Sequence, residues 1–96
     1  MCHYISLLRF TAQGAANLKK STSRAHNFDK LAAKSGVTVV GQYWTLGEYD
    51  GALILSAPSE KKVLHLLSEL TSAGNVRTAT LQAFTDAEFD GIVRGE

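Results

Sequence analysis

Two large aromatic side chains are the strongest candidates for binding a small molecule. Tyr4 lies in an apolar run near the start of the chain, and Trp44 lies in a second apolar run that ends in a glycine-containing turn. Each combines a wide planar surface with one polar group, which suits a pocket for a flat organic ligand. The same features suit ordinary packing, since burial of such a side chain contributes about 2 to 4 kcal/mol at roughly 25 cal/mol per Å². Both interpretations stay open.

Charged and hydroxyl-bearing residues complete the predicted ligand-binding set. Arg77, Thr78 and Thr80 stand in the last strand-like segment, where the planar guanidinium suits bidentate binding of a carboxylate or another anion. Arg9 and Asp50 are expected at the same end of the sheet as Arg77. We therefore predict a charged rim at that end. If the rim is only structural, Arg9 forms an ion pair with Asp50.

Catalytic residues are less clearly marked. Tyr49 lies in the turn and is the one weak candidate for donating a proton to a bound oxygen, although tyrosines at hairpin tips commonly pack across the turn. His3, His26 and His65 lie in three separate segments without spaced cysteines or carboxylates, so the sequence predicts neither a metal site nor a cofactor. It also contains no glycine-rich phosphate loop.

The first half of the chain predicts a strand, a helical region and another strand. Residues 3–10 are aromatic, β-branched or large and apolar, which is typical of a strand. Thr11 is placed to cap a short helix to about residue 20, and Ser23 to cap a longer helix that ends at Gly36. Residues 37–46 predict the second strand.

The second half repeats this order. Residues 51–57 predict a strand that pairs with the second one through a turn in which Gly47 supplies a positive φ. A helix from about Pro58 to residue 74 and a strand over residues 76–84 follow. A capping box, Thr85 with Glu88, opens a short C-terminal helix. The order βαββαβ over a single domain, residues 1–96, predicts an α+β ferredoxin-like fold: a four-stranded antiparallel sheet of strand order 4-1-3-2 with two helices on one face.

Alternation along the strands separates two faces of this sheet. We predict that the helices cover the smaller and aliphatic set, Ile5, Leu7, Val39, Gly41, Leu53, Leu55, Ala79 and Leu81. The opposite set mixes aromatic, aliphatic and polar side chains: Tyr4, Ser6, Leu8, Gln42, Trp44, Ile54, Thr78, Thr80 and Gln82. A face of this kind measures on the order of 400 Å², which is large for an exposed apolar patch. We expect a second copy to cover it, giving a homodimer with a pocket between the paired sheets.

Two sequence blocks resemble the GYD domain family of small bacterial and archaeal proteins. The first is the run Tyr43–Trp44–Thr45–Leu46 followed by Gly47–Glu48–Tyr49–Asp50, and the second runs from Asn75 to Thr78 and continues with Thr80, Leu81, Ala83 and Phe84. The resemblance implies a dimeric α+β barrel, the class that includes muconolactone isomerases and cofactor-free monooxygenases, and it carries no assigned activity over to this chain. Gly51 departs from the expected apolar residue, which predicts a bulge that moves Asp50 away from the sheet.

Composition narrows the class of protein further. The 96 residues carry a net charge of +1, far from the strongly basic balance of a dedicated nucleic-acid binder. The charge is uneven, since residues 1–36 hold six bases and one acid whereas the rest holds four bases and eight acids. One cysteine and the absence of a long apolar run predict a cytoplasmic protein that does not bind membranes.

Three functions fit these features. The leading prediction is a homo-oligomer that binds an apolar or aromatic small molecule between its paired sheets. The first alternative is a cofactor-independent isomerase or monooxygenase that acts on an aromatic substrate, which rests on analogy of fold. The second alternative is a purely structural assembly protein, in which the oppositely charged halves of neighbouring copies attract one another.

Overall fold

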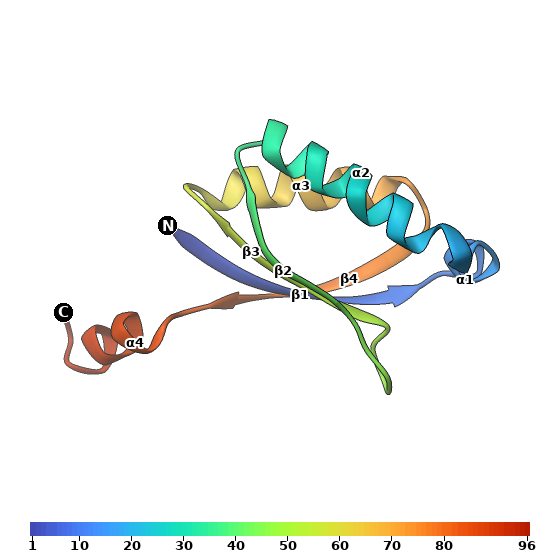
Figure 1. Ribbon diagram of the computed structural model, residues 1–96. Coiled ribbons are helices and arrows are strands. Elements are labelled where there is room, and N and C mark those ends of the chain that lie inside the picture. Colours follow the sequence, from blue (N-terminus) through green and yellow to red (C-terminus); the bar gives the residue numbers. More distant parts are fainter.

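Four strands form a single antiparallel sheet in the computed structural model, which describes all residues from 1 to 96 (Figure 1). The strands are β1 (Cys2–Phe10), β2 (Thr38–Trp44), β3 (Gly51–Ala57) and β4 (Val76–Ala83). They lie in the order β2-β3-β1-β4, so the N-terminal strand is central and pairs with both β3 and β4. This order is the predicted order 4-1-3-2 counted from the other edge, and it confirms the ferredoxin-like α+β fold.

Four α-helices accompany the sheet. They are α1 (Ala12–Ala16), α2 (Ser21–Lys34), α3 (Glu60–Ser72) and α4 (Asp86–Val93), with a 3₁₀ turn over Leu18–Lys20. Thr11 caps α1 as predicted, since its hydroxyl accepts a hydrogen bond of 3.1 Å from the Gly14 N–H. The predicted cap at Ser23 is wrong. The 3₁₀ turn runs directly into α2, and Arg24 closes this junction by donating to the Asn17 carbonyl at 2.9 Å.

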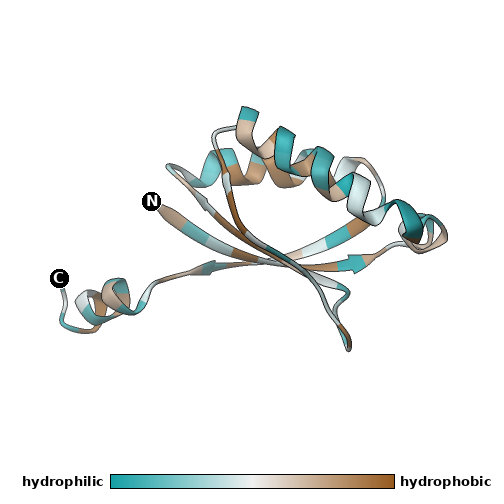
Figure 2. Cartoon of the chain, viewed as in Figure 1, coloured by the Kyte–Doolittle hydropathy of each residue, from teal (hydrophilic) through white to brown (hydrophobic).

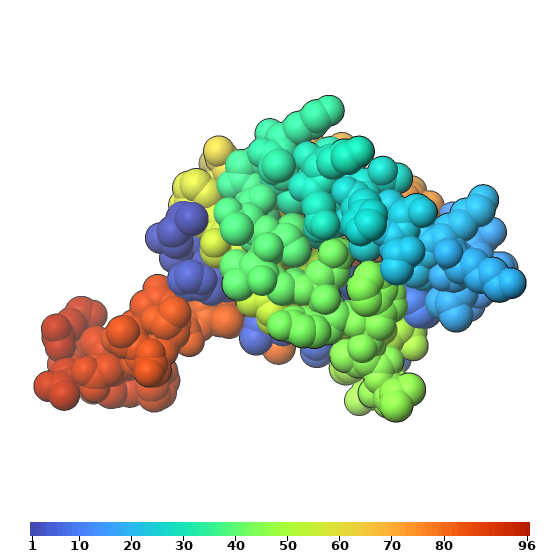
Figure 3. All heavy atoms as spheres, in the orientation of Figure 1, coloured from blue at the N-terminus to red at the C-terminus, as the bar shows by residue number.

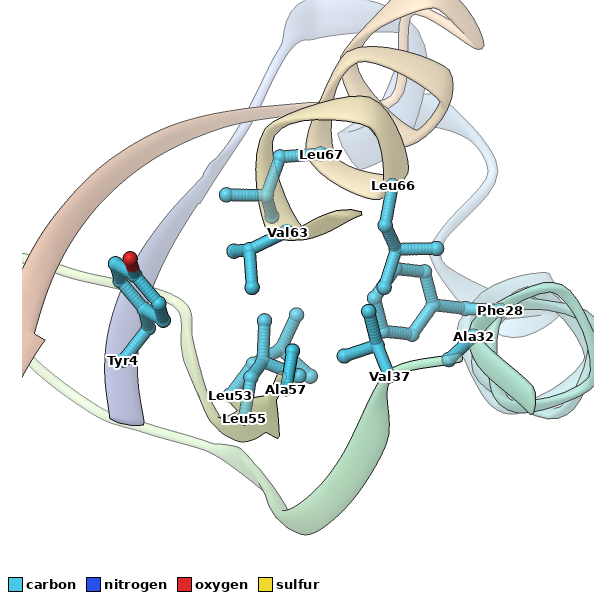
Figure 4. Close-up of a cluster of buried hydrophobic side chains, with 10 residues drawn as sticks. All are labelled: Tyr4, Phe28, Ala32, Val37, Leu53, Leu55, Ala57, Val63, Leu66 and Leu67. Atoms are coloured by element: carbon cyan, nitrogen blue, oxygen red, sulfur yellow. The ribbon is translucent and has the colours of Figure 1, made fainter. Parts of the chain in front are cut away.

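The core lies between one face of the sheet and the helices α2 and α3 (Figure 4). It contains ten buried residues: Tyr4, Phe28, Ala32, Val37, Leu53, Leu55, Ala57, Val63, Leu66 and Leu67. The helical members recur at three- and four-residue spacing, so each helix presents one apolar stripe to the sheet. Figure 2 shows that α4 also carries apolar residues, although it lies outside this core.

The pairing register shows which side chains share a face, because residues directly opposite one another in neighbouring strands point the same way. Tyr4 pairs with Leu55, and Ser6 pairs with Leu53. Since both leucines are at most 1% exposed beneath the helices, Tyr4 and Ser6 also lie on the helix-covered face. Ile5 and Leu7 consequently point to the opposite side.

The predicted assignment of faces is therefore wrong for much of the sheet. Most of the set predicted for the open face lies under the helices instead: Tyr4, Ser6, Leu8, Gln42, Trp44, Thr78, Thr80 and Gln82. The aliphatic residues predicted to be covered lie on the open face: Ile5, Leu7, Ala79 and Leu81, together with Gly41. Only Val39, Leu53, Leu55 and Ile54 lie where they were predicted.

A hydrogen bond explains how a serine occupies the core. Ser6 is fully buried, and its hydroxyl lies 2.9 Å from the Thr80 hydroxyl across the β1–β4 pair. A buried hydroxyl with a partner costs far less than one without, so the central strand tolerates a polar residue at this position. Aliphatic character alone was thus a poor guide to the covered face.

The C-terminal helix projects away from the rest of the molecule (Figures 1 and 3). It follows β4 after only two residues, Phe84 and Thr85, and gives the chain an elongated outline of 48 × 31 × 17 Å. The predicted capping box is present: the Thr85 hydroxyl accepts from the Glu88 N–H at 3.1 Å, and the Glu88 carboxylate accepts from the Thr85 N–H at 2.8 Å. We call residues 85–96 the C-terminal arm.

Candidate functional site

The turn between β2 and β3 forms the first candidate region. Gly47 adopts a φ of 106°, as the hairpin prediction requires. The Thr45 hydroxyl donates to the Tyr49 carbonyl at 2.6 Å, and the Thr45 N–H donates to the Asp50 carbonyl at 2.9 Å. These bonds hold residues 45–50 as an ordered tip that projects below the sheet, on the side away from α2 and α3 (Figure 1).

Arg9 contacts this tip at Glu48 and Tyr49 rather than at the predicted Asp50. Its guanidinium lies 2.7 Å from the Glu48 carboxylate and 4.7 Å from the centre of the Tyr49 ring. The predicted ion pair between Arg9 and Asp50 is therefore wrong. Because the Arg9 and Glu48 side chains are 50% and 72% exposed, their ion pair contributes little to stability. Tyr49 has a cation–π contact with Arg9, which gives its ring a structural role.

Asp50 fastens the tip to the central strand. Its carboxylate accepts a hydrogen bond of 2.8 Å from the Phe10 N–H, and its own N–H donates to the Leu8 carbonyl at 2.8 Å. The prediction that Gly51 would move Asp50 away from the sheet is thus wrong. A carboxylate that accepts from a backbone N–H makes a stronger bond than a neutral acceptor, so this contact stabilises the end of the β1–β3 pairing.

A cavity of about 290 Å³ forms the second candidate region. It lies between the sheet, α2 and the end of α3, next to the core rather than within it. Its walls are mainly apolar, with Phe10, Phe28, Tyr43 and Trp44 as the aromatic side chains and Leu31 and Leu70 among the aliphatic ones. This size and lining match a site for a small, largely apolar molecule.

Small residues explain why the core is not filled at this end. Ala25 of α2, Gly51 of β3 and Ala73 at the end of α3 all line the cavity. None of them carries a side chain beyond Cβ, so no side-chain atoms fill the space between the helices and the sheet at this end. A closely packed interior normally leaves few voids of this size.

Polar groups from several parts of the chain reach the same cavity. They are Arg24, Gln42, Asp50, Glu69 and Asn75. The Asp50 carboxylate is already bound to Phe10, whereas Arg24 uses two of its donors on Asn17 and Ser21 and has others left for a ligand. The cavity thus combines apolar walls with a guanidinium that can orient the polar end of a ligand.

The structure does not bring the predicted ligand-binding residues together. Trp44 lines the cavity and is half exposed. Tyr4, Thr78 and Thr80 lie on the same face of the sheet but outside the cavity lining, and Arg77 lies on the open face directly opposite Arg9. Tyr4 belongs to the core, where burial is the main cause that raises its pKa above the usual value, with Cys2 and Glu60 adding to the effect.

Most residues that line the cavity were not predicted from the sequence as part of a site. Phe10 lies in the first predicted strand, and Leu31 and Leu70 lie in the two longer predicted helices; none of them was given a binding role. A signal was present in the sequence, since Ala25 and Ala73 place small residues near the ends of those helices. It could not be used without knowing which helix ends face one another.

No group of three or more His, Cys, Asp or Glu side chains is arranged to hold a metal ion. None of the helices has both the length and the apolar character that crossing a bilayer requires.

Comparison with known proteins identifies the family. The GYD domain model matches residues 4–93, so the chain belongs to the GYD domain family. A relative from Thermus thermophilus, the "glutamine synthetase and cystathionine beta-lyase binding protein", is 35% identical over 86 residues that cover 88% of this chain and 90% of the relative.

A solved structure supports the fold. The crystal structure of TTHA0845 from Thermus thermophilus superimposes with a TM-score of 0.58 and 21% sequence identity, covering 88% of this chain and 95% of that one. At this level of identity the likeness concerns the ferredoxin-like arrangement alone.

Proposed function

We propose that this GYD-domain protein is a homo-oligomeric binding protein that docks on a metabolic enzyme of the glutamine synthetase or cystathionine beta-lyase type. The observation that carries the proposal is the Thermus relative, which is similar over nearly the full length of both chains and is named for binding these two enzymes. The open sheet face supports the oligomer, because Ile5, Leu7 and Ile54 give it an apolar centre that no helix covers (Figure 1).

The outer surface of α2 is the proposed docking site for the enzyme. Pairing of two copies through their open sheet faces leaves α2 and α3 facing solvent. Residues 1–36 carry six basic side chains against one acidic side chain, and α2 exposes Lys30 and Lys34 one helical turn apart. Clustered positive charge of this kind favours an acidic surface on the partner and speeds association at low salt.

The test is a binding titration with the glutamine synthetase and the cystathionine beta-lyase of the same organism. We expect co-elution with at least one enzyme and a dissociation constant in the micromolar range or below. Lys30→Glu combined with Lys34→Glu should weaken binding at least tenfold, whereas Lys61→Glu with Lys62→Glu on α3 is the matched control. Absence of binding to both enzymes at 50 µM, a concentration on the order of the dissociation constants of weak specific complexes, would overturn the proposal.

A second candidate function is the binding of a small molecule, and the cavity of about 290 Å³ favours it. The predicted location between paired sheets is replaced in this proposal by the cavity under α2, where Trp44 lies. The ligand would be a flat apolar molecule whose polar end accepts hydrogen bonds from Arg24. A cofactor-independent enzyme for an aromatic substrate would use the same cavity.

Trp44 provides the test of this second function, because it is the only tryptophan in the chain. Benzoate and benzamide serve as a charged and an uncharged probe, and either should change the tryptophan emission on binding. Ala73→Leu should abolish the change by filling the cavity, whereas Ala16→Leu on α1 should leave it intact. Conversion of a probe during the titration would indicate an enzyme. An unchanged emission with both probes at 10 mM would count against the cavity as a binding site, because this is roughly the weakest dissociation constant expected for such small ligands.

A further inference from the structure

The C-terminal arm contains a helix that is well capped but unsupported. The α4 helix has eight residues, begins with the Thr85–Glu88 capping box and ends at Val93, after which Arg94 is the C-cap and Gly95 has a φ of 79°. Isolated helices shorter than about 12 residues are only marginally stable in water, so a helix of this length depends on packing against another surface. Good caps at both ends stop a helix from fraying but do not replace that packing.

The arm presents an apolar stripe to solvent. Phe89, Ile92 and Val93 recur at three- and four-residue spacing, so they lie on one side of α4. Their exposed fractions are 58%, 49% and 63%. All hydrogen bonds of the arm stay within residues 85–96, and its one ionic contact with the rest of the chain joins Glu88 to His3 at 3.8 Å.

The arm cannot reach the open sheet face of its own chain. Only Phe84 and Thr85 link β4 to α4, and two extended residues span at most about 7 Å. The helix therefore continues outward from the end of β4 (Figures 1 and 3). A partner surface must come from another molecule.

The open sheet face offers a complementary surface at its far end. Arg9 and Arg77 lie directly opposite one another there, and Arg77 has no ion-pair partner. The arm contains the four acids Asp86, Glu88, Asp90 and Glu96 against one base, Arg94, so its side chains carry a net charge of −3. An acidic helix with an apolar stripe thus matches an apolar sheet face that ends in the unpaired Arg77, beside the Arg9–Glu48 ion pair.

We infer that the C-terminal arm of one copy packs on the open sheet face of a second copy, at the end marked by Arg9 and Arg77. This inference rests on the proposed homo-oligomer and specifies its geometry. The arm leaves from the opposite end of the sheet, so a two-fold axis that is parallel to the sheets and perpendicular to the strands brings each arm to the arginines of the other copy. Both arms are then used, and the assembly closes as a dimer.

The areas involved agree with a stable dimer. The sheet face alone supplies on the order of 400 Å² per copy, which is below the roughly 800 Å² per partner of a standard interface. Phe84, Phe89, Ile92 and Val93 add roughly another 400 Å², given about 150 to 250 Å² for each buried aromatic side chain and their present half-exposure. The arm therefore supplies about half of the interface.

The first experiment measures the mass of the full chain by light scattering between about 1 and 100 µM. We expect a dimer of the 10.4 kDa chain. Phe89→Ser with Ile92→Ser should weaken dimerisation roughly a thousandfold or more, because each substitution counts twice in a symmetric dimer. Leu64→Ser is the matched control, since Leu64 is 70% exposed on α3 and lies outside the proposed interface. Circular dichroism checks that every variant is folded.

The second experiment locates the arm. In a Cys2→Ser background, one sample carries Ile92→Cys and the other carries Ala79→Cys, which lies on the open face of β4. A short bismaleimide should join the two different chains after mixing. A dimer that resists the arm substitutions and gives no mixed product overturns the arm inference and leaves the homodimer standing. A monomeric full chain overturns both, and enzyme binding is measured separately in the titration described above.

Discussion

Gly14 offers the sharpest test of the packing between α1 and the loop before β4. It is a buried residue of α1, and a Cβ added to it would lie 2.0 Å from the Asn75 carbonyl oxygen. That oxygen accepts a hydrogen bond of 3.1 Å from the Thr11 N–H. Gly14→Ala must therefore displace backbone atoms rather than a flexible side chain, and the displacement disturbs this bond.

Two effects of opposite sign decide the outcome. Alanine is favoured over glycine inside a helix by about 1 kcal/mol, which alone would stabilise the protein. Overpacking against fixed neighbours costs about 1 to 3 kcal/mol, and loss of a backbone hydrogen bond adds about 1 kcal/mol. We expect Gly14→Ala to lower the free energy of unfolding by about 1 to 3 kcal/mol, because the contact is with backbone and cannot relax cheaply.

Urea unfolding followed by Trp44 fluorescence measures this change. Gly91→Ala is the matched control, since Gly91 lies in α4 and an added Cβ would meet nothing within 4 Å. The control should raise the helix content of the arm without loss of global stability. A Gly14→Ala protein that is as stable as the wild type, or more stable, would refute the steric reasoning and show that the loop at Asn75 moves freely.

Three further changes have expected outcomes. Asp50→Ala should lower the free energy of unfolding by about 1 to 2 kcal/mol in urea, because the Phe10 N–H loses an ionised acceptor, and Asp50→Asn should recover most of it. Burial raises the pKa of Tyr4 above 10.0, so above about pH 10 the folded state keeps a proton that the unfolded state releases. The free energy of unfolding should therefore fall as the pH rises above 10. In Tyr4→Phe, thermal unfolding at the same pH values should show a shallower fall. The Thr85 N–H lowers the pKa of Glu88 below 4.5, so amide protection in α4 should be present above that pH and disappear as the pH falls through the lowered value, whereas Glu88→Gln should show no such dependence by NMR hydrogen exchange.

The order of elements could be predicted because local signals marked nearly every boundary. Thr11, Gly47 and the Thr85–Glu88 capping box each act over a few residues and are found where the sequence places them. β3 spans the predicted residues 51–57 without change. The start of α2 was missed because a 3₁₀ turn continues into the helix, and no side-chain cap marks such a junction.

The faces of the sheet could not be predicted from the same signals. In β1 both alternating sets are largely apolar, so hydrophobicity does not choose between Tyr4 and Ile5 for the core. The choice depends on pairing with Leu53 and Leu55, which is a contact between segments about fifty residues apart. The predicted site failed for the same reason, because Arg77 alternates with Thr78 and falls on the other face.

The central position of β1 has a consequence for synthesis of the chain. This strand leaves the ribosome before the other three, yet one of its two neighbours, β4, begins 66 residues after Phe10. At about 5 to 20 residues per second, the β4 edge of β1 stays unpaired for roughly 3 to 13 s. The sheet is therefore completed only after β4 has been made. A nascent chain of this protein should need protection from aggregation at its first strand more than at any later one.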